Sequence, residues 1–341
     1  MVKDNLLKII DQYKKYTFSK ATKNIIYHAL TREQKKYFGT LNPEKIFYVI
    51  RSIDDKSRFY IGPKNNLLAN YFYVLSHIQY AINNGWIPII DQLNYPVYNS
   101  VDFPINGTMN AWEYYWKQPC NYTLEEVYQS KNVVLSKQNW FSEYDMGYDV
   151  EKYKNPEIIH RFYELSKIIP FNEETENIIE GKCNSLFGNK KNILGVAFRF
   201  GGHSQRHFEK AVGHPIQPEI DEMIKVVYVY LNKWNMDYIF LTSDTDEAIK
   251  EFQHVFGNKL IFLERKRFSE NLKKGEKNKI YLKNNLYQTS IDYLTEMALL
   301  SKCDCFISSI NSGMRYALIR NNNKYKNVKI LNYGLVKKEE Y

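Results

Sequence analysis

The second half of the chain alternates between short apolar runs and longer segments with helical periodicity. The apolar runs are rich in Ile, Val, Leu and Phe, as strands that are buried on both faces of a sheet usually are. The segments between them repeat apolar residues at the spacing of one helix face. Strands that alternate with helices in this way form a parallel sheet. The predicted strands lie at 192–198, 236–242, 258–264, 304–309 and 328–333, and the predicted helices at 217–234, 244–256, 289–303 and 311–322.

The first half of the chain shows a shorter version of the same alternation. Apolar runs at 45–51, 86–91 and 130–136 predict strands, and a Gly-Pro turn leads into a helical segment that ends near Gly85. This unit of strand, helix and strand is also typical of a parallel sheet.

A polar stretch at 151–190, interrupted by Pro156 and Pro170, separates the two halves and predicts a domain boundary. We therefore expect an α/β protein with two Rossmann-like, doubly wound domains that face one another across a cleft. The predicted N-terminal domain spans 1–165 and includes a helical extension at 1–40, and the predicted C-terminal domain spans 166–341.

The composition narrows the classes of partner. The 341 residues include 47 Lys and Arg against 38 Asp and Glu, a formal net charge of +9 that attracts anions in general. The basic residues are scattered and form no long block and no nucleic-acid-binding motif. A basic nucleic-acid-binding protein is therefore the weaker alternative, and we expect no nucleic-acid partner.

The cysteines and the N-terminal segment bear on location. The four cysteines fit neither a disulfide framework nor a metal-binding pair, which favours a reducing compartment. The first twenty residues carry charge throughout, so they resemble neither a signal peptide nor a membrane span. Lysines between apolar residues at helical spacing allow contact with an anionic membrane surface. We expect a cytoplasmic protein, with peripheral association at the inner face of the membrane as an option.

Polar residues follow three of the predicted strands in the second domain. Because carboxyl ends of parallel strands meet at one edge of a sheet, we expect these residues to lie close together. A helix start rich in Ser, Asn and Gly offers backbone N–H groups to a phosphate, and an arginine can bind the same phosphate through paired hydrogen bonds. The residues that form this predicted diphosphate site are Arg199, Ser243, Asp244, Ser309, Asn311, Ser312 and Gly313.

Each of these residues also has a purely structural interpretation. Ser309, Asn311 and Ser312 are common helix caps, and Asp244 can cap the following helix. Three histidines after Arg199, at positions 203, 207 and 214, raise the question of a metal site. The glycines before them favour a loop, and no further ligand stands at a zinc-like spacing, so we expect neither a metal nor another cofactor.

The second domain resembles the donor-binding domain of the fucosyltransferase superfamily, and most closely the α-1,6-fucosyltransferases. Three family motifs carry the resemblance. The first covers Ala197 to Gly202 and then "HPI" at 214–216, the second is "LTSD" at 241–244, and the third combines Glu296 with "LLSKCDCFI" and "SSINSG". In the first domain, "GPKNNLLANYFYVLSHIQYAINNG" is similar to the glycine-rich loop and first helix of the family.

The resemblance implies a GT-B fold and inverting sugar transfer without a required metal. The donor that the resemblance implies is a nucleotide sugar, with GDP-fucose as the leading candidate. The implied acceptor is a glycan or lipid-linked oligosaccharide of a bacterial surface polysaccharide. It also implies that Arg199 holds the β-phosphate, that Ser309, Asn311 and Ser312 line the phosphates, and that Glu296 faces the base. Asn65, Asn66 and Trp112 are expected on the acceptor side.

The chain departs from the first family motif at three positions. Ala197, Phe200 and Gly202 stand where the family has a histidine, a second arginine and an aspartate. These departures leave the base and the sugar of the donor open. They also motivate an alternative, a homologue that binds sugar nucleotides and has lost catalysis.

An inverting transferase needs a base for the acceptor hydroxyl or a very dissociative transition state. The candidates are Asp91 at the end of a predicted strand, Glu113 in "NAWEYYW", and His214. The aromatic residues around Glu113, which include Trp112, suit either a platform that stacks on a sugar or an aromatic corner of the core. The sequence leaves these alternatives open.

Overall fold

The computed structural model describes residues 31–52, 67–200, 213–267 and 285–337. These residues form two compact units. Unit 1 holds the described residues up to Ser100, together with Ile105–Glu113 and Gln118–Asp145, and unit 2 holds Val101–Pro104, Tyr114–Lys117 and the described residues from Met146 onward. That the two predicted domains face one another across a cleft stays a prediction.

The division between the units differs from the predicted boundary between residues 165 and 166. Residues 146–165 belong to unit 2 because helix α6 (Pro156–Ser166) packs against helix α12 (Ser312–Asn321) of that unit. Ile159, Phe162 and Leu165 form the buried face of α6, at the three- and four-residue spacing of an amphipathic helix.

The described strands of unit 1 form a sheet in the order β1-β4-β2-β3. β2 pairs in parallel with β3 and β4, as the alternation of strands and helices predicts, and β1 pairs antiparallel with β4. The predicted helical extension is wrong at residues 34–36, which form β1 because their backbone pairs with residues 133–135. The bounds are β1 Gln34–Lys36, β2 Leu41–Arg51, α3 Leu67–Asn83, β3 Ile87–Asp91, α4 Leu124–Val127, β4 Ser130–Leu135 and η2 Ser142–Tyr144.

The described strands of unit 2 form a wholly parallel sheet in the order β7-β6-β5-β8-β9. This arrangement confirms the predicted α/β class, although the strand predicted at 258–264 is reduced to two residues. The remaining bounds are α5 Val150–Lys154, α7 Glu173–Leu186, β5 Ile193–Phe198, α8 Ile220–Lys233, β6 Tyr238–Ser243, α9 Asp246–Phe256, η4 Gly257–Lys259, β7 Leu260–Ile261, α11 Leu286–Leu300, β8 Cys305–Ser309 and β9 Asn327–Leu331.

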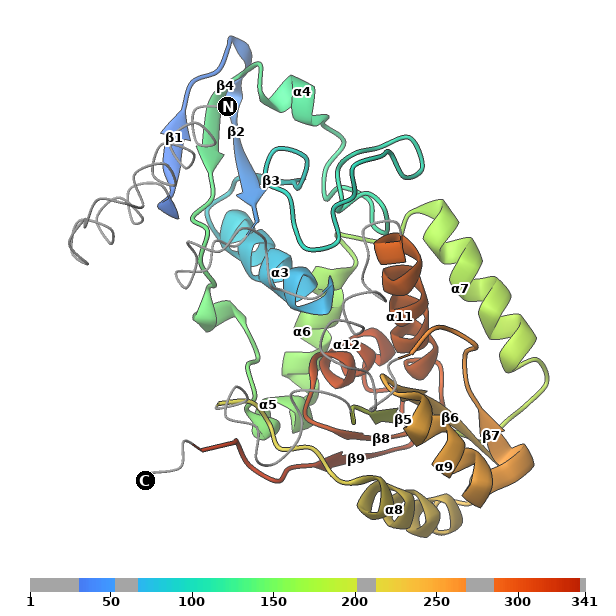
Figure 1. Cartoon of the computed structure of the whole chain (residues 1–341). Coiled ribbons are helices and arrows are strands. Elements are labelled where there is room, and N and C mark those ends of the chain that lie inside the picture. The colour runs from blue at the N-terminus through green and yellow to red at the C-terminus, as the bar shows by residue number, and fades with distance from the viewer. Residues whose placement is uncertain (1–30, 53–66, 201–212, 268–284, 338–341) are drawn as a thin grey trace, which may run out of the picture. The chain divides into compact units, whose positions relative to one another are not determined.

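Helices cover both faces of the unit 2 sheet (Figure 1). Helices α8 and α9 pack on one face, where alternate strand residues such as Leu194, Val196 and Leu241 enter a common apolar core. Helices α11 and α12 pack on the other face, where Gly195 leaves room for the end of α11: a Cβ at this position would stand 3.3 Å from Leu300 Cδ2. The chain is doubly wound around its parallel sheet, as predicted.

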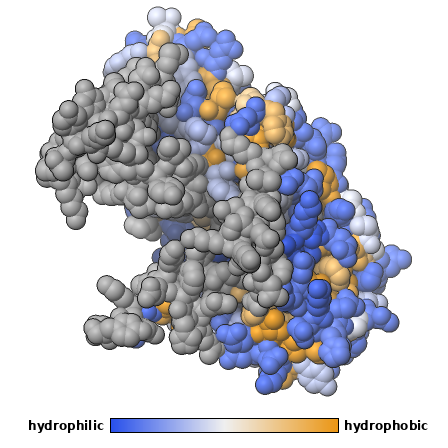
Figure 2. Space-filling model, in the orientation of Figure 1, coloured by the Kyte–Doolittle hydropathy of each residue, from blue (hydrophilic) through white to orange (hydrophobic). Residues whose placement is uncertain are grey.

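The surface is mixed. On the face shown in Figure 2, apolar residues lie in small patches separated by hydrophilic ones. Within the described part of the chain, no helix has the length and apolar character needed to cross a membrane.

Candidate functional site

The order of the strands in unit 2 marks one point of the sheet. From β5 the chain continues through β6 to β7 on one side, and β8 and β9 then follow on the other side of β5. Ligands of open parallel sheets bind outside the carboxyl ends of the strands at such a reversal. Arg199 directly follows β5, and the segment Asn311–Gly313 directly follows β8, so the structure brings both predicted anion-binding groups to the point of reversal.

Asn311 shapes the start of α12. Its side-chain oxygen accepts a hydrogen bond from the Met314 N–H over 2.9 Å, and its side-chain nitrogen donates to the carbonyl of Ser309 over 2.9 Å. Asn311 is thus the N-cap of α12, as its structural interpretation predicts. The next two N–H groups, those of Ser312 and Gly313, have no acceptor among the described residues. They lie at the positive end of the helix dipole, where an anion is favoured.

Ser309 is predicted to line the phosphates, but its hydroxyl is used within the protein. Its side chain is fully buried, and its hydroxyl donates to the side-chain oxygen of Gln217. The neighbouring Ser308 hydroxyl donates to the carbonyl of Ala197 over 3.0 Å and so joins the end of β8 to the end of β5. Both serines therefore fix the backbone that carries Arg199 and Asn311 and present no free hydroxyl.

Arg199 is partly exposed, and its guanidinium affects the pKa values of two other side chains. Partial burial lowers the pKa of His214 below its ordinary value, and the nearby guanidinium of Arg199 lowers it further. Burial raises the pKa of Tyr293 on α11 to about 12, while Arg199 acts in the opposite direction. The guanidinium therefore lies within electrostatic range of both side chains.

Tyr293 connects Arg199 with the start of α12. Its hydroxyl oxygen lies 3.5 Å from the position that a Cβ would take on Gly313. The sequence analysis missed this residue. Its spacing of three residues from Glu296 on a predicted helix is a signal that places the two side chains on one face.

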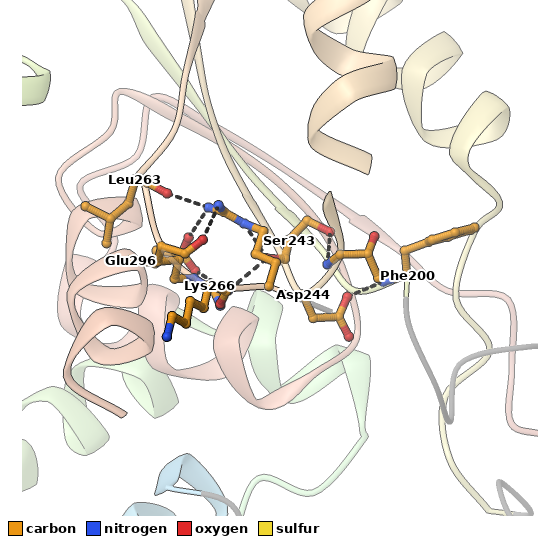
Figure 3. Close-up of polar contacts among 9 residues, drawn as sticks. Phe200, Ser243, Asp244, Leu263, Lys266 and Glu296 are labelled. Atoms are coloured by element: carbon orange, nitrogen blue, oxygen red, sulfur yellow. Dashed lines mark hydrogen bonds and ion pairs between the residues drawn. The ribbon is translucent and has the colours of Figure 1, made fainter. Parts of the chain in front are cut away.

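Asp244 joins two strand ends. Its carboxylate oxygen accepts a hydrogen bond over 2.9 Å from the N–H of Phe200, the residue after Arg199, and Figure 3 shows Asp244 turned toward that backbone. The structural interpretation of Asp244 as the cap of α9 is wrong, because Thr245 is the N-cap. Asp244 instead holds the chain that leaves β5 against the end of β6.

The carbonyl of Ser243, which is labelled in Figure 3, accepts hydrogen bonds from two arginines that follow β7. Arg265 Nη2 donates to it over 2.8 Å and Arg267 Nε over 3.2 Å. The two guanidinium groups also lie 2.9 Å from the two carboxylate oxygens of Glu296, whose side chain is fully buried. The sequence analysis missed both arginines, since nothing in their spacing pairs them with Glu296.

This network bears on the role expected for Glu296. A buried carboxylate whose two oxygens each meet a guanidinium serves first to neutralise those arginines. The carboxylate of Glu296 is therefore already paired with two arginines of the protein. It is also buried, whereas direct contact with a nucleotide base requires an exposed carboxylate.

Asp91, a candidate base, is fully buried at the end of β3. One carboxylate oxygen accepts hydrogen bonds from the N–H groups of Leu93 and Asn94, and the other accepts from the Tyr128 hydroxyl over 2.6 Å and from the Asn94 side chain over 2.9 Å. These bonds shape the turn after β3 and leave Asp91 no exposed oxygen for an acceptor.

Glu113 is in a similar situation. Thr108, Asn110 and Gln118 all donate hydrogen bonds to its carboxylate, the shortest over 2.7 Å. Gln118 and Asn110 also bond the backbone of Ile90 in β3. Glu113 therefore organises the loop beside the end of β3.

The aromatic residues around Glu113 are buried, so the second of their two interpretations is confirmed. The Trp112 side chain is 0% exposed and stacks on Tyr71 of α3, which rules it out as an exposed platform for a sugar. In unit 2, Tyr114, Tyr115 and Trp116 are equally buried, and Tyr115 stacks on Tyr287 at 5.7 Å between ring centroids.

Several predicted residues lie outside the described residues: Asn65, Asn66, Gly202, His203 and His207. Among the residues that are described, no group of three or more His, Cys, Asp or Glu side chains could hold a metal ion. His214 lies at the bend directly before Pro215. It is the candidate base that lies in electrostatic range of Arg199.

Fold and candidate site together define a protein with a doubly wound α/β unit that carries Arg199 and the start of α12 at its switch point. No protein-family model and no curated protein matches this chain. Among solved structures, it is similar to the NodZ α-1,6-fucosyltransferase soaked with GDP-fucose, at 13% identity over 81% of this chain and 93% of that chain, with a TM-score of 0.44. It is also similar to fucosyltransferase NodZ from Bradyrhizobium, at 13% identity over 80% and 92% with a TM-score of 0.43. POFUT1 in complex with GDP shows 11% identity over 85% and 76%, with a TM-score of 0.38.

Proposed function

We propose that this protein is a glycosyltransferase that transfers a sugar from a GDP-sugar to a glycan or lipid-linked oligosaccharide acceptor. Fucose is the leading candidate for the sugar. The observation that carries the proposal is the position of Arg199 and the start of α12 at the carboxyl ends of β5 and β8, on either side of the switch point. A guanidinium and free N–H groups of a helix start suit the two phosphates of a nucleotide sugar.

The chemistry follows from the leaving group. As the bond between the anomeric carbon and the diphosphate oxygen breaks, its electron pair goes to the diphosphate, and negative charge develops there. Arg199 and the N–H groups of Ser312 and Gly313 are fixed donors that stabilise this charge more than that of the intact donor. They can do so without a metal ion, and we propose a metal-independent reaction.

We propose that His214 is the base that takes the proton of the acceptor hydroxyl. Its lowered pKa keeps the imidazole neutral near pH 7, so it can accept the proton of an acceptor hydroxyl while that oxygen bonds to the anomeric carbon. Attack on the face opposite the diphosphate inverts the anomeric configuration. Asp91 and Glu113 are the weaker candidates because their carboxylates are already hydrogen-bonded within the protein.

The biological setting belongs to the same proposal. A glycan acceptor carried on a lipid would place the reaction at the inner face of the cell membrane, with synthesis of a surface polysaccharide as its role. The formal net charge of +9 suits work beside an anionic surface.

A thermal-shift screen with GDP, UDP, CDP and dTDP tests the donor, because only a nucleotide that binds the folded protein raises its melting temperature. We expect GDP to give the largest shift. Arg199→Ala should abolish both the shift and sugar transfer while the melting temperature of the free protein stays within a few degrees. Arg161→Ala, at an exposed position on α6, is the matched control.

Three results would redirect the proposal. No shift with any nucleotide, or full activity of the Arg199 variant, would overturn the phosphate site. A shift without transfer to any acceptor would favour the homologue that has lost catalysis. Binding to heparin that modest salt abolishes, without nucleotide binding, would favour a nucleic-acid-binding protein.

A further inference from the structure

Tyr293 and Met297 on α11 lie against Gly313 in the first turn of α12. A Cβ on Gly313 would stand 2.4 Å from Met297 Sδ and 3.5 Å from the Tyr293 hydroxyl oxygen. A Cβ at 2.4 Å is well inside van der Waals contact, so a side chain at position 313 would require Met297 to move. The Tyr293 hydroxyl thus lies beside the first turn of α12, which begins with Ser312 and Gly313.

The Tyr293 hydroxyl has no hydrogen-bond partner among the described residues, and its side chain is half-buried. Tyr73 and Tyr128 of unit 1 differ in this respect, since their hydroxyls donate to Arg51 O and to Asp91 Oδ2. Burial raises the pKa of Tyr293 to about 12, with Glu296 and Asp244 acting in the same direction, so the phenol keeps its proton at neutral pH.

We propose that the Tyr293 hydroxyl is a further binding residue of the site, a hydrogen-bond donor to the diphosphate of the nucleotide sugar. This inference rests on the proposed function, since it names a third element that contacts the same ligand. Arg199 follows β5, Ser312 and Gly313 begin α12, and Tyr293 adds a neutral donor from α11. Three rigid elements then hold the diphosphate, and the Tyr293 donor also meets the charge that develops when the sugar leaves.

The test is Tyr293→Phe, which removes the hydroxyl and keeps the ring. The probe is the nucleoside diphosphate that gives the largest thermal shift, GDP by expectation, and its affinity is measured by calorimetry. A hydrogen bond to a charged phosphate contributes enough that its loss should weaken binding about tenfold or more. Tyr228→Phe is the matched control, because Tyr228 is 60% exposed on α8, on the other face of the sheet.

Two further measurements separate a binding role from a structural one. The free energy of unfolding without nucleotide should be the same for Tyr293→Phe and wild type, because the hydroxyl bonds no described residue. The ³¹P signals of the bound nucleotide should differ between the two proteins, which a role in packing alone would not produce.

The outcomes distinguish this inference from the proposed function. If the wild type binds no nucleoside diphosphate, both fail. If the wild type binds GDP and Tyr293→Phe binds it equally well, the role of Tyr293 is wrong and the proposed function stands. If Tyr293→Phe loses nucleotide affinity and stability together, the hydroxyl is structural, and the inference fails as well.

Discussion

Arg267 Nη2 donates a hydrogen bond to Glu296 Oε1 over 2.9 Å, and neither side chain is more than 2% exposed. Arg265 Nη2 lies 2.9 Å from the other carboxylate oxygen of Glu296. One carboxylate thus compensates two buried guanidinium groups that also hold the carbonyl of Ser243 at the end of β6. These contacts hold the carboxyl end of β6, which lies at the same edge of the sheet as the proposed site.

Glu296→Gln should strongly destabilise the protein. The substitution leaves two buried guanidinium groups without a compensating charge, and breaking a buried ion pair from one side costs about 3–5 kcal/mol. Urea denaturation measures the free energy of unfolding. Glu164→Gln is the control: Glu164 pairs with Lys167 over 2.6 Å, but both side chains are about half exposed, so the loss should stay below about 1 kcal/mol. Equal losses in the two variants would contradict a structural role for Glu296.

Gly313→Ala should destabilise unit 2, because the added Cβ would stand 2.4 Å from Met297 Sδ. Overpacking of this kind costs about 1–3 kcal/mol, although alanine is ordinarily the better helix former. Gly181→Ala on α7 is the matched control, since no atom lies within 4 Å of its added Cβ, and it should stabilise the protein by about 0.5–1 kcal/mol.

A second substitution checks the cause. Met297→Ala removes the side chain that the new methyl group would meet, so Gly313→Ala should cost less in that background than in wild type. Denaturation of the four proteins gives the coupling between the two positions. Additive losses would show that the cost at position 313 comes from elsewhere.

His77 should make stability fall in mild acid. Its Nδ1 lies 2.9 Å from the Tyr48 hydroxyl and its Nε2 lies 3.1 Å from the Asn139 carbonyl, so Nε2 carries the proton and Nδ1 accepts. Burial lowers the pKa of His77 to about 3, and Lys137 and Arg51 act in the same direction. Below about pH 6.5 the unfolded chain binds a proton that the folded protein does not, so stability falls by up to about 1.4 kcal/mol per pH unit.

Denaturation between pH 7.5 and about pH 5 measures this dependence. The His77→Gln variant should be less stable at neutral pH. Its stability should also depend much less on pH, because glutamine binds no proton in either the folded or the unfolded chain. His160→Gln replaces an exposed histidine and should keep the wild-type slope. A slope unchanged in His77→Gln would contradict the prediction.

Asp91→Asn should lower stability rather than catalysis alone. The new amide group would turn a donor toward Tyr128 Oη or Asn94 Nδ2, both of which donate to Asp91. An unsatisfied buried polar group costs about 1–3 kcal/mol. Tyr128→Phe, which removes one of these donors, should have a smaller effect. An Asp91→Asn protein with wild-type stability and no transferase activity would restore Asp91 as the catalytic base.

The proposed site shows how far the sequence reaches. Arg199 and the segment Asn311–Gly313 could be predicted because they follow apolar runs, and parallel strands bring their carboxyl ends to one edge. Tyr293, Arg265 and Arg267 could not be assigned in the same way. Their roles depend on how α11 and the segment after β7 pack, and no local pattern encodes that packing.

The sequence by itself determined the order of strands and helices and thereby the α/β class, because the periodicity of apolar residues is a local property that each segment carries alone. Only the tertiary structure decided which polar groups are already used within the protein. Asp91 meets Tyr128 across 37 positions of the chain, Glu296 meets Arg267 across 29, and Ser309 meets Gln217 across 92. A sequence shows the type of a side chain, but whether that side chain is free to bind a ligand depends on partners that folding alone brings into contact.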